Sequence, residues 1–311
     1  GWATVLRHFE EMGVNPETDE YSTVAIGDPA GDVFGNGVVY LKQKTQCTNK
    51  MKLLGAFNHK HIFLDPNPNA QAAYEERVRL VENVQGWDHY NTDLISAGGG
   101  VFSRSAKSIP ISTEVQQMLG LMKEQTELAP EVVIRLLLRL NVDMLWNGGM
   151  GTYVKSSDES HMDAGDPSND HLRVNGSELR CRIVGEGGNL GFTQKGRIEY
   201  ALNGGRVNTD AIDNSGGVDM SDHEVNLKIL LNPMVAAGEL GLEARNTLLE
   251  SMTEEVAQDV LSNNNIHGRQ LSLDSVRSEV DPMAFAIAIQ WVCTRSATTR
   301  AFLRLPSDEE L

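Results

Sequence analysis

The sequence predicts a doubly wound α/β fold, in which a parallel sheet carries helices on both faces and is followed by an α-helical segment. Three observations support this prediction. Short apolar runs alternate with segments of helical periodicity through roughly the first two thirds of the chain. Several of these apolar runs end in a turn rich in glycine and asparagine. Beyond Ser221 the strand pattern stops, and the remaining residues have helical periodicity.

The first predicted elements form a strand, a turn and a helix. Trp2 and Phe9 lie on the apolar face of an N-terminal helix that ends at Gly13. A short apolar strand follows at residues 23–26 and leads into a glycine-rich turn, residues 27–37, and a second apolar run. Strand, glycine-rich turn and helix make up the first unit of a dinucleotide-binding, Rossmann-like fold.

Further strands are predicted from apolar runs at residues 53–57, 142–146, 182–184 and 206–209. Helices are predicted between them at residues 74–84, 131–140 and 193–202. The polar and acidic residues 156–180 are expected to form a surface excursion of low order. The alternation of strand and helix implies a parallel sheet, because parallel strands need crossover connections.

The chain divides into two predicted parts. Residues 1–224 form the dinucleotide-binding domain with its N-terminal helix, and residues 225–311 form an α-helical C-terminal segment. In the second part, helices are expected at residues 225–231, 248–260 and 282–303. We expect Pro233 to end the first of them, because proline interrupts helical hydrogen bonding.

The composition argues against several classes of protein. Acidic residues number 43 against 27 Lys and Arg, a formal net charge of -16, whereas a nucleic-acid partner needs a basic face. We find no apolar run long enough to span a membrane and no signal peptide. Cys47, Cys181 and Cys293 lie far apart in the sequence, which predicts reduced thiols in a cytoplasmic protein. Because the chain starts with Gly-Trp and has no initiator Met, we expect it to be a piece of a longer protein.

The first glycine-rich turn is not a clean G-x-G-x-x-G motif. Its glycines include Gly27 and Gly31, and backbone amides at the start of the next helix would suit a pyrophosphate. Asp28 and Asp32 bring negative charge to the same turn and disfavour that ligand. From these residues alone, a dinucleotide site and a tight turn without a ligand both remain open. Residues 103–108, SRSAKS, suit either an anion site or a solvated loop.

Asn58 follows the second strand, where dinucleotide folds usually carry an acid that binds the adenosine ribose. An Asn side chain can still hydrogen-bond a 2'-hydroxyl, and the neighbouring His59 and Lys60 would tolerate a 2'-phosphate. The residues therefore leave NAD and NADP open. His59 and His61 share one side of a strand, but no third ligand is evident in the sequence, so we expect no metal site.

Two turns later in the chain carry the most specific signal. EGGN, residues 186–189, follows a predicted strand and resembles the EGAN turn of the glutamate dehydrogenases. DNSGGVDMSDHE, residues 213–224, resembles the N-A-G-G-V-x-x-S-x-x-E segment of the same family. The segments IGDPAGDVFGNG, LWNGGMGTYVK and VGEGGNLGFTQKGRIEYAL are similar to the large bacterial NAD-specific members, and the resemblance extends over nearly the whole chain.

The resemblance implies an NAD site in this chain. Gly31-Asp32-Val33 stands where related dehydrogenases carry Gly-Asn-Val-Gly, with Phe34 in place of the last glycine. The residues implied to contact the cofactor are Gly27, Gly31, Asp32, Val33, Asn58, Asn147, Gly148, Asn189 and Asn214. Among them, the last four are implied to lie on the nicotinamide side. Asn and Gly are also common turn residues, so turn geometry alone is the alternative reading.

Val218 and Ser221 resemble positions that contact the substrate side chain, and Ser221 is implied to bind the distal carboxylate of glutamate. The residues themselves also allow a structural role for Ser221. It would cap a helix, with Glu224 at the third helical position as in a capping box.

The resemblance also implies an activity for the intact protein: a homo-oligomeric enzyme that oxidises L-glutamate to 2-oxoglutarate and ammonium and passes a hydride to NAD. Its catalytic Lys and Asp are expected upstream, in a domain whose glycine-rich Lys motif we do not find here, so no catalytic residue is assigned and this piece alone is expected to be inactive. One alternative is a leucine, valine or phenylalanine dehydrogenase, which the Ser221 hydroxyl disfavours. Another is a non-catalytic regulatory or assembly module with the same fold, which Asp32 and Phe34 favour.

Overall fold

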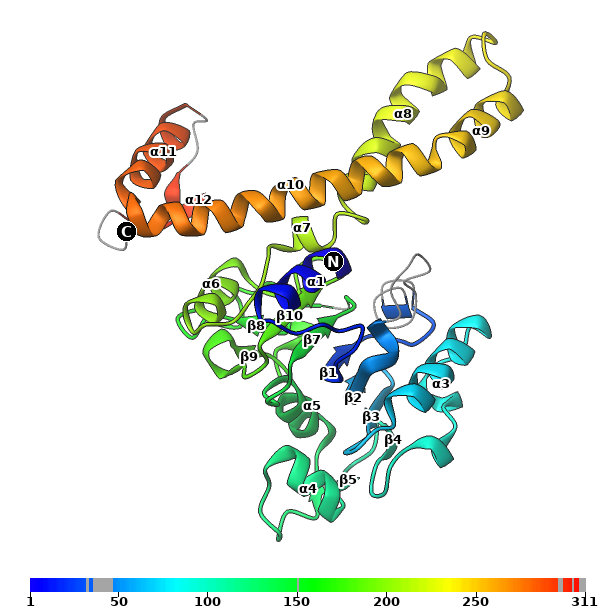
Figure 1. The fold of residues 1–311 in the computed structure, drawn as a ribbon, viewed down its shortest axis with the longest axis vertical. Helices are drawn as coiled ribbons and strands as arrows, with labels where there is room; N and C mark the ends of the chain where they lie inside the picture. Colours follow the sequence, from blue (N-terminus) through cyan, green and yellow to red (C-terminus); the bar gives the residue numbers. More distant parts are fainter. Residues whose placement is uncertain (32–33, 36–46, 150, 296–298, 304, 308–311) are drawn as a thin grey trace.

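The computed structural model describes residues 1–31, 34–35, 47–149, 151–295, 299–303 and 305–307. Figure 1 shows an α/β body built on one central sheet and a group of helices that lies beyond it. Asp32 and Val33, which were predicted to contact a cofactor, fall outside the described residues. The predicted fold class, an α/β sheet followed by helices, is confirmed.

The central sheet has six strands in the order β10-β7-β1-β2-β3-β4. Their bounds are β1 Tyr21–Ile26, β2 Met51–Phe57, β3 His61–Leu64, β4 Gly100–Ser103, β7 Met144–Asn147 and β10 Ile183–Glu186. The strands β10, β7, β1 and β2 are mutually parallel, as predicted. In contrast, β3 and β4 add an antiparallel extension. Residues 58–60 between β2 and β3 are too few for a crossover, so β3 returns as a hairpin.

The register of the parallel strands brings four turns to one edge of the sheet. Ile26 is the partner of both Phe57 and Asn147, and Asn147 is in turn the partner of Glu186. These four residues are the last of β1, β2, β7 and β10. The turns that follow them therefore open side by side, and we call this the carboxyl edge. Ligands of open α/β sheets bind at such an edge.

Helices cover both faces of the sheet, as predicted. On one face, α1 (Trp2–Glu11) and α3 (Ala70–Glu82) pack with buried aromatic residues that include Trp87 and Tyr90. On the other face, α4 (Thr113–Leu119), α5 (Pro130–Leu138) and α6 (Gln194–Leu202) pack with Tyr153. The first turn of α6 is fixed by Thr193, whose hydroxyl accepts a hydrogen bond from the Gly196 amide at 3.0 Å. A small two-stranded sheet, β5 (Ile109–Pro110) with β6 (Glu127–Leu128), lies beside α4.

Two predictions about the segments that flank α6 were wrong. Residues 156–180 are ordered by the parallel pair β8 (Val154–Lys155) and β9 (Val174–Asn175) and by the buried Arg173 guanidinium. That guanidinium donates to the Thr152 carbonyl at 2.9 Å and to Asp170 Oδ1 at 2.6 Å, and these hydrogen bonds order the segment. Residues 206–209 form no strand, because only Arg206 bridges to β10.

The C-terminal helices are α7 (Asp210–Asp213), α8 (Asp219–Ala236), α9 (Leu242–Ser251), α10 (Thr253–Val280), α11 (Pro282–Arg295) and α12 (Arg300–Leu303). Figure 1 shows α10 crossing over the body, with α8 and α9 as a hairpin at one end and α11 at the other. The buried Asn264 anchors α10 on the body, because its amide donates to the Ile212 carbonyl at 2.7 Å. The prediction that Pro233 ends a helix was wrong, since α8 continues through it to Ala236.

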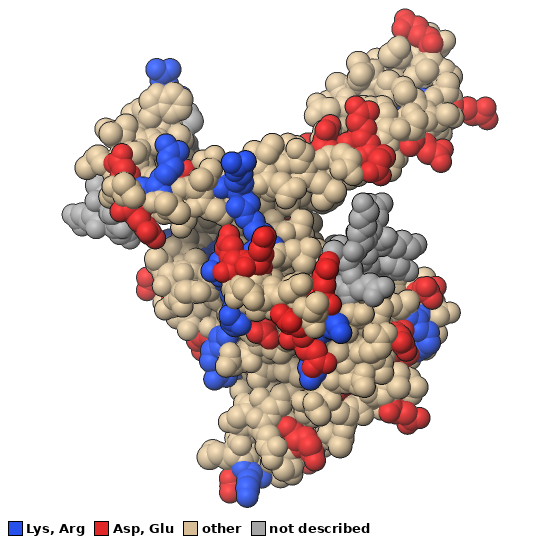
Figure 2. Space-filling model, viewed as in Figure 1, with Lys and Arg blue, Asp and Glu red and all other residues tan. Residues whose placement is uncertain are grey.

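The surface is consistent with the acidic composition. On the face shown in Figure 2, acidic and basic side chains of the described residues are interspersed over the body, and the α8–α9 hairpin is mainly acidic. Among the helices in the described ranges, none combines the length and apolarity needed to cross a membrane.

Candidate functional site

The turn after β1 is held tightly to the core. The Gly27 amide donates to the Phe57 carbonyl at 2.8 Å, and the Trp87 indole donates to the Gly27 carbonyl at 2.9 Å. Gly27 has a φ of +144°, and a Cβ there would lie 2.8 Å from the Phe34 ring. Phe34, where relatives were expected to carry glycine, is 1% exposed and packs edge-on against Trp87 at 5.5 Å. Its ring therefore fills the core instead of the carboxyl edge.

Asn58 is engaged within its own turn. Its side chain is 1% exposed, and its amide nitrogen donates to Asp28 Oδ2 at 2.7 Å. Its amide oxygen accepts from the backbone amides of Lys60 and His61 at 2.8 and 2.7 Å. Dinucleotide folds usually carry an acid after the second strand. Here the half-buried Asp28 places a carboxylate beside that strand end, and the Asn58 side chain holds this carboxylate in place. Gly31 closes the same turn, with its amide donating to the Asp28 carbonyl at 2.8 Å.

Arg104 also reaches this turn, although no individual role for it was predicted. Its guanidinium donates to the Asn58 carbonyl at 2.8 Å, and its backbone amide donates to the Lys60 carbonyl at 2.8 Å. The cation comes from the residue after β4, which the antiparallel hairpin brings back to the carboxyl edge. Its position depends on the direction of β3 and β4, which periodicity does not reveal.

The turns after β7 and β10 are in backbone contact. The Gly148 amide donates to the Ile26 carbonyl and the Gly187 amide to the Asn147 carbonyl, both at 2.8 Å. A Cβ on Gly188 would lie only 2.5 Å from the Gly149 Cα. Glycine is therefore required for these two turns to approach so closely.

Asn147 lies at the centre of this contact. Its side chain is 1% exposed, and its amide oxygen accepts from the Gly149 amide at 3.0 Å. Its amide nitrogen is buried and has no hydrogen-bond partner among the described residues. A buried orphan donor beside a glycine cradle suits a polar planar group such as a carboxamide. The residues present here therefore fit a nicotinamide cofactor.

The two family-like segments meet in space. Asn214 Nδ2 donates to Asn189 Oδ1 at 2.7 Å, so the turn after β10 and the turn after α7 are joined side chain to side chain. Asp210 holds the other part of the first turn, because its Oδ2 accepts from the Leu190 amide at 2.8 Å. The structure thus brings Asn147, Asn189 and Asn214 to one region of the carboxyl edge.

Glu186, the last residue of β10, forms a buried ion pair that the sequence analysis did not single out. Its Oε2 accepts from Arg197 Nε at 3.0 Å and Nη2 at 2.7 Å, and its side chain is fully buried. Burial raises the pKa of the Glu186 carboxyl to about 7, against the opposing effect of Arg197. Glu186 ends β10 and Arg197 lies on α6, so the pairing depends on how the strand and the helix pack, which no local pattern in the sequence reveals.

Val218 and Ser221 lie at the start of α8, directly after this region. The Val218 amide donates to the Asn214 carbonyl at 3.0 Å, which ties the helix start to the Asn189–Asn214 pair. Ser221 is exposed, and its hydroxyl donates to the Val218 carbonyl at 2.7 Å. The prediction that Ser221 caps the helix with Glu224 was wrong, because α8 already begins at Asp219.

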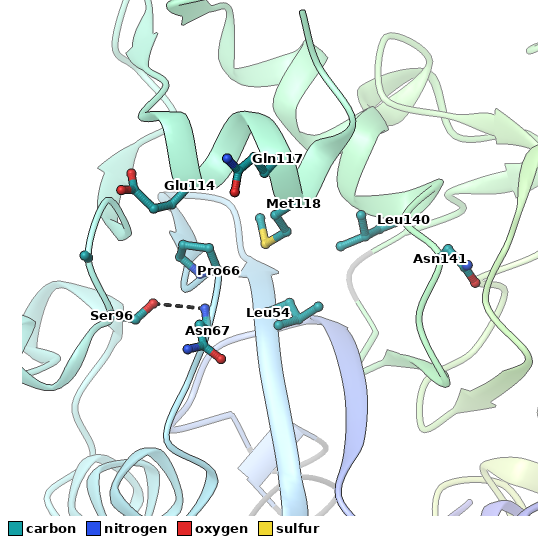
Figure 3. Close-up of a pocket in the computed structure, with 10 residues that line it drawn as sticks. Leu54, Pro66, Asn67, Ser96, Glu114, Gln117, Met118, Leu140 and Asn141 are labelled. Carbon is teal, nitrogen blue, oxygen red and sulfur yellow. Dashed lines mark hydrogen bonds between the residues drawn. The ribbon is translucent and has the colours of Figure 1, made fainter. Parts of the chain in front are cut away.

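A separate cavity of about 460 Å³ lies away from these turns. Figure 3 shows the apolar side chains of Leu54, Met118 and Leu140 among those that line it, and the backbone amide of Asn67 donates to Ser96 Oγ at 2.9 Å. Asn141 borders it and precedes β7, so the cavity lies toward the amino end of that strand. Within the described ranges no cluster of three or more His, Cys, Asp or Glu residues suits a metal ion.

Comparisons with known proteins agree with the sequence resemblance. A family model described as bacterial NAD-glutamate dehydrogenase, catalytic domain, matches residues 1–274. The NAD-specific glutamate dehydrogenases of Pseudomonas aeruginosa and Halomonas elongata are 50% and 49% identical over 311 residues. Each match covers 100% of this chain and 19% of the relative, so the chain spans about a fifth of their length.

The solved structure of Plasmodium falciparum glutamate dehydrogenase is 16% identical and has a TM-score of 0.42, covering 89% of this chain and 49% of that one. That likeness is too distant to add to the assignment. The matched family description names a catalytic domain and does not mention a cofactor-binding part, so the prediction that this chain is the cofactor-binding part stays a prediction. Because the family model matches residues 1–274, the chain belongs to the bacterial NAD-glutamate dehydrogenase family.

Proposed function

We propose that this chain supplies the NAD site of a glutamate dehydrogenase that interconverts L-glutamate with 2-oxoglutarate and ammonium. One observation carries the proposal: the Asn189–Asn214 hydrogen bond joins the two family-like turns at the carboxyl edge, beside the glycine contact of residues 148–149 and 188. The names of the relatives support NAD as the cofactor and glutamate as the substrate.

In this proposal the nicotinamide ring lies on the glycine contact, where the absence of side chains lets backbone approach a planar group. Asn147 offers its unpartnered amide, and Asn189 and Asn214 fix each other toward the ring and its ribose. Bound NAD would supply the hydride acceptor, while the protein supplies position and electrostatics. Asp28 and Arg104 then lie at the adenosine end of the bound cofactor. Asn58 contributes there indirectly, because it holds the Asp28 carboxylate in place.

The substrate side is assigned to the start of α8. Val218 would contact the methylene groups of glutamate, and the exposed Ser221 hydroxyl would turn from the Val218 carbonyl toward the distal carboxylate. A hydrogen bond to a charged acceptor is stronger than one to a carbonyl, so this exchange is favourable. The catalytic Lys and Asp are proposed to lie in the four fifths of the relatives that this chain does not cover. We further propose a cytoplasmic, homo-oligomeric intact enzyme.

A paired experiment tests the proposal. NADH, NAD and NADPH are titrated into the chain by calorimetry, and the same sample is assayed for glutamate-dependent formation of NADH. We expect binding of NADH and NAD, weaker binding of NADPH, and no turnover. Absence of NADH binding would contradict the cofactor assignment, and robust turnover would contradict the placement of the catalytic residues outside this chain.

A further inference from the structure

Two buried polar atoms at the carboxyl edge lack partners and have complementary chemistry. They are the amide nitrogen of Asn147 and Oε1 of Glu186, neither of which has a hydrogen-bond partner in the described part of the chain. A Cβ built on Gly191 would lie 1.7 Å from the first atom and 2.9 Å from the second. The orphan donor and the orphan acceptor therefore border the same glycine, in the turn that carries Asn189.

The other half of the Glu186 carboxylate is already committed. Oε2 accepts two hydrogen bonds from Arg197, and Arg197 also donates to Gln194 Oε1 at 2.6 Å. Oε1 is thus the oxygen left to address Asn147. An ionised Oε1 is a strong acceptor for an amide N–H, whereas a protonated one would present its own O–H to that donor. The protonation state of Glu186 therefore decides how the Asn147 amide is held.

We propose that Glu186 is a positioning residue for the cofactor: when the cofactor is bound, the ionised Oε1 of Glu186 accepts a hydrogen bond from one N–H of the Asn147 amide. The second N–H of that amide is then directed to the nicotinamide. This inference rests on the proposed function, because it assigns a role within the same cofactor site. It adds a residue that does not touch the reacting atoms and acts through Asn147.

The groups around Glu186 place the pKa of its carboxyl near neutral pH. Burial raises the pKa of this carboxyl to about 7, Arg197 from α6 opposes that shift, and Asp210 and Asp213 from α7 reinforce it. Asn147 from β7 is neutral. Asp213 Oδ2 accepts from the Glu186 backbone amide at 3.0 Å, and the Asp213 carboxylate raises the pKa of two groups at the N-terminus, the Gly1 amino group and the His8 side chain on α1, against the larger lowering by burial. Cofactor affinity should accordingly rise as pH rises through about 7.

The test is the pH dependence of NADH affinity in the full chain, followed by NADH fluorescence between about pH 5.5 and about pH 8.5. We expect the affinity of the wild-type chain to rise roughly fivefold across this range, the worth of one amide hydrogen bond. Glu186→Gln keeps an acceptor for Arg197 but presents a donor to Asn147. It should bind NADH at the weak, low-pH level throughout.

Glu76→Gln is the matched control, because Glu76 is a buried carboxylate paired with Arg79 at 2.6 Å on α3. In this variant the affinity for NADH should still rise with pH, because losing an ion pair of a buried carboxylate away from the site should not alter the pH dependence of binding. If Glu186→Gln does not fold, Asn147→Ala replaces it and should bind weakly with no rise. Two results would overturn this inference alone. One is NADH binding by the wild-type chain with an affinity that does not rise with pH, and the other is a rise with pH that persists in Glu186→Gln or Asn147→Ala. Failure of the wild-type chain to bind NADH at any pH would overturn the proposed function and this inference with it.

Discussion

Asn214 donates a hydrogen bond of 2.7 Å to Asn189 across a separation of 25 residues. This single contact joins the turn after β10 to the segment that leads into α8. The two segments that resemble one family therefore form a single structural unit, because each supplies one side chain of this amide pair. Because the two side chains hold each other, loss of one Asn should change how the other contacts a bound cofactor.

The first prediction concerns this amide pair. Asn214→Ala and Asn189→Ala should each weaken NADH binding, and the double variant should lose less than the sum of the two single losses. The expected coupling is about 1 kcal/mol, the net worth of one hydrogen bond. A double-mutant cycle by calorimetric titration measures it. Asn203→Ala, at the exposed C-terminal end of α6, is the control and should leave affinity unchanged. Strictly additive losses would show that the pair does not act as a unit at the site.

The second prediction concerns Asn58, which is buried against Asp28 at 2.7 Å. Asn58→Asp replaces the donor with a second carboxylate, so we expect the free energy of unfolding to fall by about 3 kcal/mol near neutral pH. The loss should shrink toward low pH, because like charges raise the pKa of one member of the pair. Urea unfolding at several pH values measures this. Asn246→Asp, on the exposed surface of α9, should cost little. Equal stability of wild type and Asn58→Asp would mean that Asn58 does not hold Asp28.

The third prediction concerns Ser221. In the intact enzyme, Ser221→Ala should lower kcat/KM for glutamate roughly tenfold to a hundredfold, as expected for a hydrogen bond to a charged group. The matched control is Ser251→Ala, since the Ser251 hydroxyl donates to the Leu248 carbonyl at 2.7 Å, the same bond that Ser221 makes to Val218. Both variants should have nearly unchanged melting temperatures. Only Ser221→Ala should alter glutamate kinetics, and unaltered kinetics would remove Ser221 from the substrate site.

The fourth prediction links stability to pH through Glu186. Its pKa is raised from the usual value for Glu, about 4.3, to about 7 in the folded chain, chiefly by burial. The folded state therefore binds a proton more tightly than the unfolded state. The resulting stabilisation is complete below about pH 4.3 and is lost as pH rises through about 7. The neutral side chain in Glu186→Gln removes this dependence.

The measurement is the free energy of unfolding of both chains between about pH 5 and about pH 8. Groups common to the two chains cancel in the difference. The stability of Glu186→Gln relative to wild type should rise steadily over this interval. A constant difference would show that Glu186 does not titrate there.

The sequence predicted the parallel core and the main helices because each is encoded locally. The apolar runs that became β1, β2, β7 and β10 each end in a turn with glycine or asparagine, whereas the strand register that brings these four turns to one edge is seen only in the structure. The hairpin direction of β3 and β4 was not predicted, because the length of a strand does not fix its orientation. Arg104 reached the carboxyl edge only through that reversal.

Other residues escaped prediction because their roles depend on pairing. Arg197 and Arg173 look like ordinary surface cations in the sequence, yet both are buried against carboxylates or carbonyls. Asn58 was assigned to a ligand, but its hydrogen bonds are made to its own turn and to Asp28. Phe34, which departs from the glycine of related dehydrogenases, is accommodated by the core beside Trp87.

Hydrogen–deuterium exchange of the chain with and without NADH tests the central claim most directly, because it locates the bound cofactor on the fold. We predict protection in the peptides that contain residues 147–149 and 187–191, extending to residues 214–218. Peptides around the cavity of Asn67 and Met118 should be unaffected. Protection at that cavity, with the carboxyl-edge turns unchanged, would contradict the account.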